Sequence, residues 1–287
     1  MGVDLFAGLT NAVLPPLGRP PCILVFDSGL GGLTVLAELV TALPHAAYVY
    51  AADDAAFPYG ALTPEHLVTR VVTVMETLIA REAPDLVVIA CNTASTLALP
   101  ALRARFALPF VGTVPAVKPA VAATRSGLVT VLATPGAARS EHTRAMIDAF
   151  AGSAEVTLVG APNLAAFAEA ELRGTPIDDD ALRAEIAPCF VEHDGRRTDA
   201  VALACTHFPL LTRRFRTLSP WDVAWIDPAP AVARRVAALV GASATTTGVL
   251  HDRRALFTSR RPAPPPLVRA LAARGLDAVE NSVLPLD

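Results

Sequence analysis

The sequence predicts an α/β protein in which two duplicated, pseudo-symmetric domains with mostly parallel sheets enclose an active-site cleft. Its 287 residues fit two compact domains, at about 150 residues per domain. From Cys22 to about Val240, short β-branched runs alternate with Ala-, Leu- and Arg-rich stretches of helical period, the pattern of βα units. The two halves also repeat several short segments in the same order.

Eight buried strands are expected, because the chain contains eight short apolar runs of strand length. They span residues 22–26, 48–52, 86–90, 110–112, 128–133, 155–159, 201–204 and 223–226. Helices are expected where apolar residues recur at helical spacing. These stretches span residues 33–43, 64–82, 95–106, 140–150, 182–192 and 229–240.

An internal repeat predicts the duplication. Asp-Leu-Val-Val-Ile-Ala-Cys-Asn-Thr at 85–93 matches Asp-Ala-Val-Ala-Leu-Ala-Cys-Thr-His at 199–207, and Pro-Ala-Val follows them at 115–117 and 230–232. Two upstream matches pair 23–29 with 129–136 and 48–53 with 156–162. Because the matches keep their order along the chain, a duplicated α/β unit explains them better than chance.

The repeat also predicts where the domains divide. The first domain is expected to be discontinuous and to comprise residues 21–116 plus 228–287. The second is expected to comprise residues 117–227. Facing one another, the two domains would place equivalent strand ends on opposite walls of one cleft.

The two ends of the chain differ from the repeated units. Residues 1–20 contain Asp4 and no basic residue before Arg19, which does not suit a secretory signal, so a loosely ordered leader is expected. The tail after Ser243 contains Arg-Arg-Pro-Ala-Pro-Pro-Pro, a stiff extended break, followed by a short amphipathic stretch. We expect this tail to be a packing appendage.

Composition excludes several classes of function. Charged residues make up 18% of the chain and the formal net charge is −3, unlike the basic surface of a nucleic-acid binder. Polar residues, Pro or Gly interrupt each long apolar stretch, so no membrane segment is expected. Four cysteines without a CxxC pair do not form a disulfide-rich secreted scaffold, which favours a reducing cytoplasm.

Two of the four cysteines are candidate catalytic groups. Cys91 and Cys205 each follow a predicted strand and precede a helix. A thiol acts as a base or nucleophile only as thiolate, which a helix N-terminus or a positive neighbour favours. Cys22 and Cys189 lie within predicted elements and are interpreted as packing residues.

Other polar residues cluster at the same strand ends. His207 lies two residues beyond Cys205, so it can assist that thiol if the strand continues. Asp27 ends the first strand and is followed by Ser28, and either residue can cap the next helix. Capping would also direct backbone N–H groups into the cleft.

The glycine-rich loop at 29–32 is interpreted as a cradle for a small carboxylate. A dinucleotide fingerprint would need a third glycine where Thr34 stands. The Phe-Pro-Tyr-Gly turn at 57–60 either closes over a ligand or is an ordinary loop. Further side-chain donors at the strand ends are Asn92, Thr93, Thr134 and Thr206.

No cofactor or metal is expected. A pyridoxal Schiff base needs a lysine, and the single lysine, Lys118, lies between Val117 and Pro119. A zinc site would have to combine single residues spread over the chain without paired spacing. The permitted ligand types would be Cys91, Cys205, His207 and Asp27.

Four motifs carry a resemblance to a known family. They are Phe-Asp-Ser-Gly-Leu-Gly-Gly-Leu-Thr-Val at 26–35, Pro-Tyr-Gly at 58–60, Ala-Cys-Asn-Thr-Ala-Ser at 90–95 and Ala-Cys-Thr-His-Phe-Pro-Leu-Leu at 204–211. Together they resemble the glutamate racemase family of the aspartate/glutamate racemase superfamily. The likeness runs from about Cys22 through Val240.

The resemblance implies a cofactor-independent isomerase that supplies D-glutamate for peptidoglycan and often forms a homodimer. Cys91 is similar to the base that takes the α-proton from D-glutamate, and Cys205 to the base that takes it from L-glutamate. Asp27 and His207 are similar to the groups that support these thiols. Residues similar to those that hold the substrate are Asp27, Ser28, Tyr59, Gly60, Asn92, Thr93, Thr134, Thr206 and His207.

The residues themselves suit the same chemistry. Inverting a stereocentre by proton transfer needs one group to remove a proton and another to deliver one from the opposite face. Two thiols on opposing walls, one as thiolate and one as thiol, can exchange these roles at each turnover.

The chain departs from the family pattern in places. Ala-Asp-Asp at 52–54 stands where Gly-Asp is common, and Pro135 and Ala137 replace more polar residues. The carboxylate that the family often has in the second half aligns only loosely with Glu169, which is not assigned to the site.

Three rival functions stay open. One is the same chemistry on aspartate or another amino acid, since pocket contacts decide side-chain selectivity. The second is a thiol hydrolase that uses Cys205 and His207, with Cys91 structural. The third is a non-catalytic binding protein, against which the two intact thiols argue.

Overall fold

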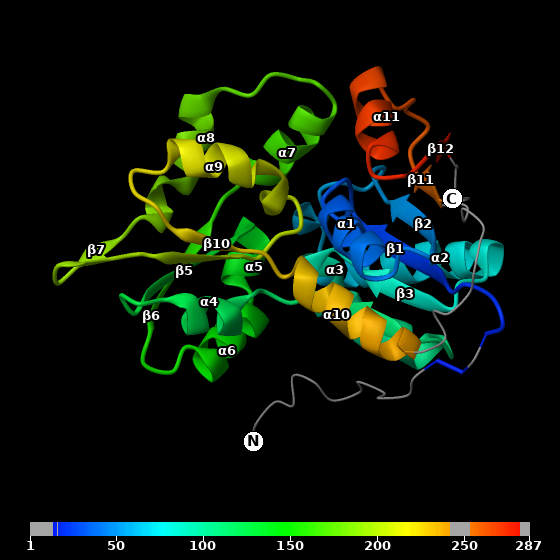
Figure 1. Ribbon diagram of the computed structural model, residues 1–287, viewed down its shortest axis with the longest axis horizontal. Helices are drawn as coiled ribbons and strands as arrows, with labels where there is room; N and C mark the ends of the chain where they lie inside the picture. The colour runs from blue at the N-terminus through cyan, green and yellow to red at the C-terminus, as the bar shows by residue number, and fades with distance from the viewer. Residues whose placement is uncertain (1–13, 16, 242–252, 282–287) are drawn as a thin grey trace.

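Two parallel β-sheets, each covered by helices on both faces, form the body of the protein (Figure 1). The computed structural model describes residues 14–15, 17–241 and 253–281. A six-stranded sheet occupies one half of the molecule and a four-stranded sheet the other. The predicted α/β class with mostly parallel sheets is confirmed.

The six-stranded sheet has the order β12-β11-β2-β1-β3-β4, with all of its pairs parallel. Its strands are β1 (Cys22–Asp27), β2 (Ala47–Ala52), β3 (Leu86–Ile89), β4 (Phe110–Gly112), β11 (Arg253–Phe257) and β12 (Ala278–Asn281). Because helices cover both faces, the central strands are apolar throughout. The helices are α1 (Leu33–Ala42), α10 (Ala229–Val240) and α11 (Pro265–Ala272) on one face, and α2 (Pro64–Glu82) and α3 (Asn92–Arg105) on the other.

The four-stranded sheet has the order β10-β9-β5-β6, also with parallel pairs. Its strands are β5 (Leu128–Ala133), β6 (Glu155–Gly160), β9 (Ala200–Leu203) and β10 (Ala224–Ile226). One face packs against α4 (Val117–Ala123) and α6 (Glu141–Phe150), and the other against α7 (Leu164–Leu172), α8 (Asp179–Ile186) and α9 (Thr212–Leu218). Short turns complete this half: α5 (Pro135–Arg139), 3₁₀-helix η2 (Ala187–Cys189) and 3₁₀-helix η3 (Phe208–Leu211).

The strand order shows the duplication directly. In the first sheet β2-β1-β3-β4 are neighbours, and in the second β6-β5-β9-β10 occupy the same places in the same order. The strands that the sequence repeat pairs, β1 with β5, β2 with β6 and β3 with β9, are therefore equivalent in space. The first sheet differs in carrying two further strands, β11 and β12.

All eight predicted strands are present, but two predictions of local structure are wrong. The helix expected at 182–192 ends at Ile186, and Pro188 lies in the η2 turn that follows because its ring cannot continue a helix. The tail is more than a packing appendage, since β11 pairs with β2 inside the first sheet. Helices α4, α7 and α9 and the strands β11 and β12 were not predicted.

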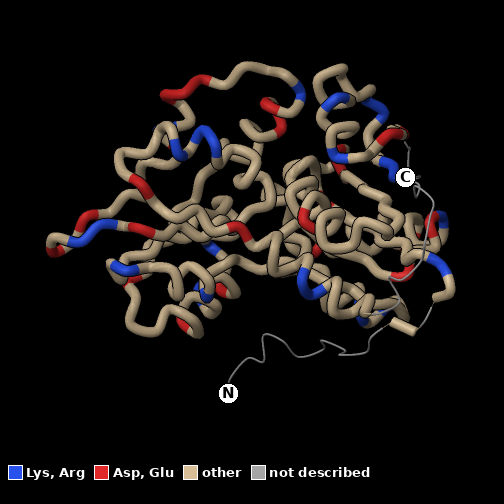
Figure 2. The backbone as a smooth tube through the Cα atoms, in the orientation of Figure 1, with Lys and Arg blue, Asp and Glu red and all other residues tan. Residues whose placement is uncertain are grey.

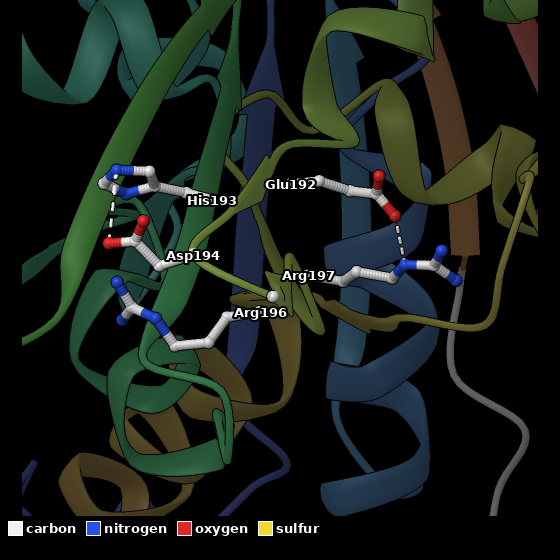
Figure 3. Close-up of a pocket in the computed structure, with 6 residues that line it drawn as sticks. Glu192, His193, Asp194, Arg196 and Arg197 are labelled. Carbon is white, nitrogen blue, oxygen red and sulfur yellow. Dashed lines mark ion pairs between the residues drawn. The ribbon is translucent and has the colours of Figure 1, made fainter.

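A charged hairpin projects from the four-stranded half. Its strands are β7 (Glu192–His193) and β8 (Arg196–Arg197), which pair antiparallel. Figure 3 shows its ion pairs, Glu192 with Arg197 and His193 with Asp194. These side chains are exposed, so the hairpin is solvated and stands apart from the strand ends that form the site.

The described end of the leader is fastened to the first sheet. The Leu14 N–H donates to the Leu239 carbonyl (2.7 Å), and the Arg19 guanidinium makes a bidentate pair with Asp85 (2.7 and 2.8 Å). The prediction of a loosely ordered leader otherwise falls on residues 1–13 and 16, which lie outside the described residues.

Basic and acidic residues are interspersed over both halves of the molecule (Figure 2). No helix among the described residues is long and apolar enough to cross a membrane.

Candidate active site

The site lies where strand ends of the two sheets meet. Strand β1 ends at Asp27, and β3 and β9 each end two residues before a cysteine, Cys91 and Cys205. A hydrogen bond joins the two sides, because the Thr206 hydroxyl donates to Asp27 Oδ2 (2.9 Å). The structure therefore brings together side chains that the sequence separates by more than a hundred residues.

The glycine-rich loop after β1 approaches the opposite side of the cleft closely. A Cβ atom at Gly29 would overlap Glu169 Oε1, and one at Gly31 would lie 2.5 Å from His207 Nδ1 and from Thr206 Oγ1. Only glycine fits at such separations. The loop N–H groups donate to protein side chains: Gly29 to Asp27 Oδ1, Leu30 to Glu169 Oε1 and Gly31 to His207 Nε2. A role for this loop as a cradle for a small carboxylate stays a prediction.

Asp27 is fully buried at the base of this loop. Its Oδ1 accepts a hydrogen bond from the Gly29 N–H (2.8 Å), and its Oδ2 accepts the one from Thr206. Burial raises the pKa of the Asp27 carboxyl, although His207 and these two hydrogen bonds oppose the rise. A carboxyl held in this way is suited to receive a proton from a neighbour.

Cys91 lies in a similarly buried position at the start of α3, with its Sγ 3.7 Å from Ser28 Oγ. Burial raises the pKa of the Cys91 thiol to about 12, and the nearby Asp27 adds to the rise. Hydrogen bonds from the Ala94 N–H and with Ser28 act in the opposite direction. A pKa this high favours the protonated thiol.

Cys205 has a different neighbour, a histidine paired with a carboxylate. The Cys205 Sγ is 3.8 Å from His207 Nδ1, and His207 Nε2 is 3.1 Å from Glu169 Oε1. Burial lowers the pKa of His207, but the hydrogen bonds with Cys205 and Glu169 outweigh it and hold that pKa well above its usual value. The raised pKa favours the protonated imidazole, and the contact with the Glu169 carboxylate suits a donor at Nε2.

Glu169 is the site residue that the sequence did not assign. It lies on α7, is 7% exposed, and accepts a hydrogen bond from the Leu30 N–H (2.6 Å) as well as from His207. Burial acts to raise its pKa, but these bonds and Arg173 hold the pKa below its usual value. The loose family alignment was the only signal for Glu169 in the sequence, because no element was predicted over the residues of α7.

Phe57 also contacts the site without having been predicted to do so. Its ring centroid is 5.4 Å from that of His207, with the planes tilted by 46°. The predicted turn at 57–60 therefore places an apolar ring beside the charged imidazole.

Asn92 and Thr93 occupy the first turn of α3. The Asn92 amide donates to the Ala204 carbonyl (3.0 Å), which is a second bond between the two sides of the cleft. Asn92 is 7% exposed, and its Oδ1 has no hydrogen-bond partner among the described residues. Thr93 is half-buried beside it. Asn92 is thus a buried acceptor available to a ligand.

Three other residues that the resemblance places at the substrate also have contacts within the protein, and their substrate contacts stay predictions. The Tyr59 hydroxyl donates to Asp53 Oδ2 (2.6 Å). The Thr134 hydroxyl caps α5 by accepting from the Ala137 N–H (3.3 Å). Gly60 is exposed and lies opposite α5, where a Cβ added at Gly136 would be 3.5 Å from the Gly60 carbonyl oxygen.

The departure at 52–54 also has a structural role. Asp53 accepts a bidentate pair from Arg70 (2.6 and 2.8 Å) and a hydrogen bond from the Thr258 hydroxyl (2.6 Å). Together with the Tyr59 bond, these contacts hold the turn at 57–60 against α2 and the C-terminal tail. Asp53 therefore organises the loop without entering the cleft.

The remaining candidates lie away from this arrangement. Cys189 is fully buried in the core under the four-stranded sheet, Cys22 is half-buried at the start of β1, and Lys118 is exposed on α4. Within residues 14–15, 17–241 and 253–281, no group of three or more His, Cys, Asp or Glu side chains could hold a metal ion.

The arrangement is suited to moving one proton between two faces of a small molecule. Cys91 and Cys205 come from different sheets, and the Cys205 thiol is near enough to raise the pKa of Cys91. Each thiol has its own acid–base partner, Asp27 or His207. One thiol can thus give a proton while the other takes one.

Comparisons with known proteins agree with this geometry. A family model for Asp/Glu/hydantoin racemases matches residues 24–236. The glutamate racemase of Agrobacterium fabrum is 55% identical over 219 residues, covering 76% of this chain and 80% of that protein. The glutamate racemase of Brucella melitensis is 52% identical over 250 residues, covering 86% and 90%.

Solved structures give the same result. Escherichia coli glutamate racemase, crystallised with L-glutamate and the activator UDP-MurNAc-Ala, superposes with a TM-score of 0.84 at 37% identity, covering 91% of this chain and 98% of that one. The glutamate racemase isoform RacE1 of Bacillus anthracis gives a TM-score of 0.75 at 27% identity, covering 93% and 99%. The chain therefore belongs to the Asp/Glu/hydantoin racemase family, and within it to the glutamate racemases.

Proposed function

We propose that Cys91 and Cys205 interconvert L- and D-glutamate by transferring a proton to and from the α-carbon, without a cofactor. The observation that carries this proposal is the presence of two buried thiols at equivalent strand ends, Cys205 in contact with His207 and Cys91 in contact with Ser28 and near enough to Asp27 for its charge to act on the thiol. Racemisation of glutamate is the isomerase activity of this family. The assignment of the two thiols and their partners follows the resemblance to the family and is supported by the contacts described above.

In the L-to-D direction, Cys205 acts as the base. As thiolate beside the charged His207, it takes the α-proton of L-glutamate, and the electron pair of the C–H bond stays on the α-carbon. The Cys91 thiol then delivers its proton to the opposite face, which forms the C–H bond of D-glutamate. The two thiols end in exchanged protonation states, so the reverse reaction starts from Cys91.

Charge must be stabilised while the α-carbon is deprotonated. The Gly31 N–H donates towards His207 Nε2 (3.2 Å), so a substrate carboxylate would have to displace that contact to use this donor. The unpaired Asn92 Oδ1 can accept from the α-ammonium. Fixed donors and acceptors of this kind stabilise developing charge without reorganising.

Asp27 is expected to serve the Cys91 side as a local proton acceptor. Burial raises the pKa of the Asp27 carboxyl, which makes this carboxylate a better proton acceptor. When the substrate ammonium enters, its positive charge favours the Cys91 thiolate, and the thiol proton can pass towards Asp27. This step would prepare Cys91 for the D-to-L direction.

The test is to incubate the protein with L- or D-glutamate in deuterated water without added cofactor. Proton NMR follows the α-proton, and optical rotation follows the configuration. Exchange with inversion from both enantiomers is the expected result. Absence of exchange from both would overturn the proposal.

Two rivals are addressed by further substrates. Racemisation of aspartate at a higher kcat/KM than glutamate would favour the rival amino-acid substrate. Release of an acid from an ester or amide substrate that depends on Cys205 and His207 but not on Cys91 would favour the thiol hydrolase.

We also propose that the protein works in the cytoplasm, where it supplies D-glutamate for peptidoglycan, and as a homodimer. Free thiols support a reducing compartment, and the described cysteines are all free. Light scattering after size-exclusion chromatography tests the dimer, because a single species at the monomer mass would contradict it.

A further inference from the structure

The inference concerns Arg173, which lies just beyond α7 and between two carboxylates. Its Nε is 3.3 Å from Glu169 Oε2, and its Nη2 is 4.0 Å from Asp54 Oδ2. Glu169 belongs to the four-stranded half, whereas Asp54 follows β2 of the six-stranded sheet. We propose that Arg173 is a positioning residue for racemisation, which the C-terminal tail holds in place through Asp54.

Asp54 is itself fixed by the C-terminal tail. Its Oδ1 accepts from the Ser259 N–H (2.8 Å) and its Oδ2 from the Ser259 hydroxyl (2.6 Å). The Arg261 guanidinium also donates to the Asp54 carbonyl (3.1 Å). Asp54 is nearly buried, so its charge faces Arg173 with little solvent screening. The tail thereby sets the direction of the carboxylate that Arg173 meets.

A second contact brings the tail to the same end of α7. Helices α7 and α11 lie side by side (Figure 1). Gly174, directly after Arg173, has a φ of +79°, and an added Cβ would lie 2.7 Å from Pro266 Cγ. The backbone next to Arg173 is therefore confined by the tail as well.

The physical role of Arg173 follows from the different contacts of the two Glu169 carboxylate oxygens. Oε1 receives both the Leu30 N–H and the His207 Nε2–H, whereas Oε2 contacts Arg173. With Oε2 anchored, the carboxylate cannot rotate away from the imidazole. Arg173 thus acts on the proton transfer through Glu169 and His207, and it does not touch the reacting atoms.

The inference rests on the proposed function, since it concerns the orientation of the group that supports Cys205. The groups that face Glu169 are the cations Arg173 and His207 and the carboxyl of Asp27. Removing Arg173 leaves the repulsion from Asp27 less well compensated. The pair with His207 is therefore expected to become longer or more mobile.

The test compares Arg173→Gln, Arg173→Lys and Asp54→Asn in the full chain. Arg173→Gln is expected to lower kcat about tenfold in both directions with KM within twofold, because the substrate contacts stay intact. Arg173→Lys should recover most of the loss, since it restores the charge beside Oε2. Asp54→Asn keeps the hydrogen bonds with Ser259 but removes the charge, and a decrease of about threefold is expected.

Arg214 of α9 provides a matched control, because it also pairs with a carboxylate of α7. Arg214 pairs with Glu171 of α7 (3.0 Å) and has a similar exposure to Arg173, 19% against 25%, but does not contact Glu169. Arg214→Gln should therefore change kcat less than twofold. Thermal melts of all variants report whether any change in kcat reflects unfolding.

A spectroscopic readout separates positioning from general destabilisation. In the wild type, ¹⁵N-labelled His207 should show a protonated Nε2 with a low-field proton signal, owing to the Glu169 bond. Arg173→Gln should shift or broaden this signal, and Arg214→Gln should not. Equal effects of these two variants on kcat or on the signal would overturn the inference. If the wild type does not racemise glutamate, the proposed function fails, whereas the His207 signal still tests the positioning.

Discussion

The two sides of the cleft share a backbone plan but differ in their electrostatics. Cys91 has a carboxyl and a hydroxyl, Asp27 and Ser28, as neighbours, and burial holds its pKa near 12. Cys205 has the charged His207, which Glu169 supports. Duplication of the fold therefore positions the two thiols, whereas their unequal neighbours are the basis for the opposite roles that we propose for them.

The largest effect is expected from removing either thiol. Cys91→Ser and Cys205→Ser should each lower the racemisation rate about 10³-fold, because a serine hydroxyl is a much weaker acid than a thiol and so supplies almost no anionic base at neutral pH. Polarimetry of L- and D-glutamate measures the loss. Cys22→Ser, at a half-buried position outside the cleft, serves as the control. Full activity in either cleft variant would refute the two-thiol assignment.

The protonation state of Cys91 should also appear in its rate of alkylation. With a pKa of about 12, Cys91 should react with iodoacetamide at pH 8 roughly a hundredfold more slowly than an unperturbed cysteine, since fewer thiolates outweigh their greater nucleophilicity. The rate at Cys91 should still rise between pH 9 and pH 10. Peptide mass spectrometry resolves the individual cysteines. A rate at Cys91 that levels off near pH 8 would contradict the assigned protonation state.

The contact between the two sides can be tested through the glycine loop. Gly31→Ala places a Cβ 2.7 Å from the His207 backbone nitrogen, so it should lower the free energy of unfolding by about 2 kcal/mol. Gly136→Ala is the matched control, because its nearest contact would be an ordinary 3.5 Å. Urea unfolding measures both. Equal stability of the two variants would mean that the loop and His207 do not pack as described.

Of these four predictions, the smallest effect is expected from Glu169→Gln, which changes the support of His207 on the Cys205 side of the cleft. We expect a loss of kcat of about tenfold, because the amide removes the charge that supports the His207 cation. The folded-state pKa of Glu169 is lowered, so its stabilisation is present above the unfolded pKa, about 4.3. The difference in unfolding free energy between wild type and variant should therefore shrink as the pH falls below about 4. A difference that is constant from pH 7 to pH 3 would contradict the ionised role of Glu169.

The repeated strands were predictable because their signals are local. Short apolar runs and the matched Cys-containing segments identify β1, β3, β5 and β9 without any knowledge of contacts. The sequence could not reveal β11, because its Arg-Arg-Ala-Leu-Phe run gains its strand character only from pairing with β2. The end of helix α8 was predicted too late in the chain. The apolar periodicity continues past Ile186, but the chain turns at Pro188.

The site divides in the same way. Asp27, Cys91, Cys205 and His207 could be predicted because each belongs to a strand-end motif. Glu169 could not, because it lies within an unremarkable helical segment and acquires its role from the Leu30 N–H more than a hundred residues away. Tyr59 was assigned to the substrate from its motif, whereas its hydroxyl is bonded to Asp53, a contact that no spacing in the sequence reveals.

The pairing of β11 with β2 also constrains how the chain is made. Arg253 lies beside Tyr48, so the ribosome must add roughly two hundred residues before this pair can form. Until then β2 is an open sheet edge, whereas the strands of the four-stranded sheet are contiguous along the chain and can assemble earlier. The unpaired edge of β2 is therefore a site where a nascent chain can pair with another chain, and a chain that stops before Arg253 keeps that edge open.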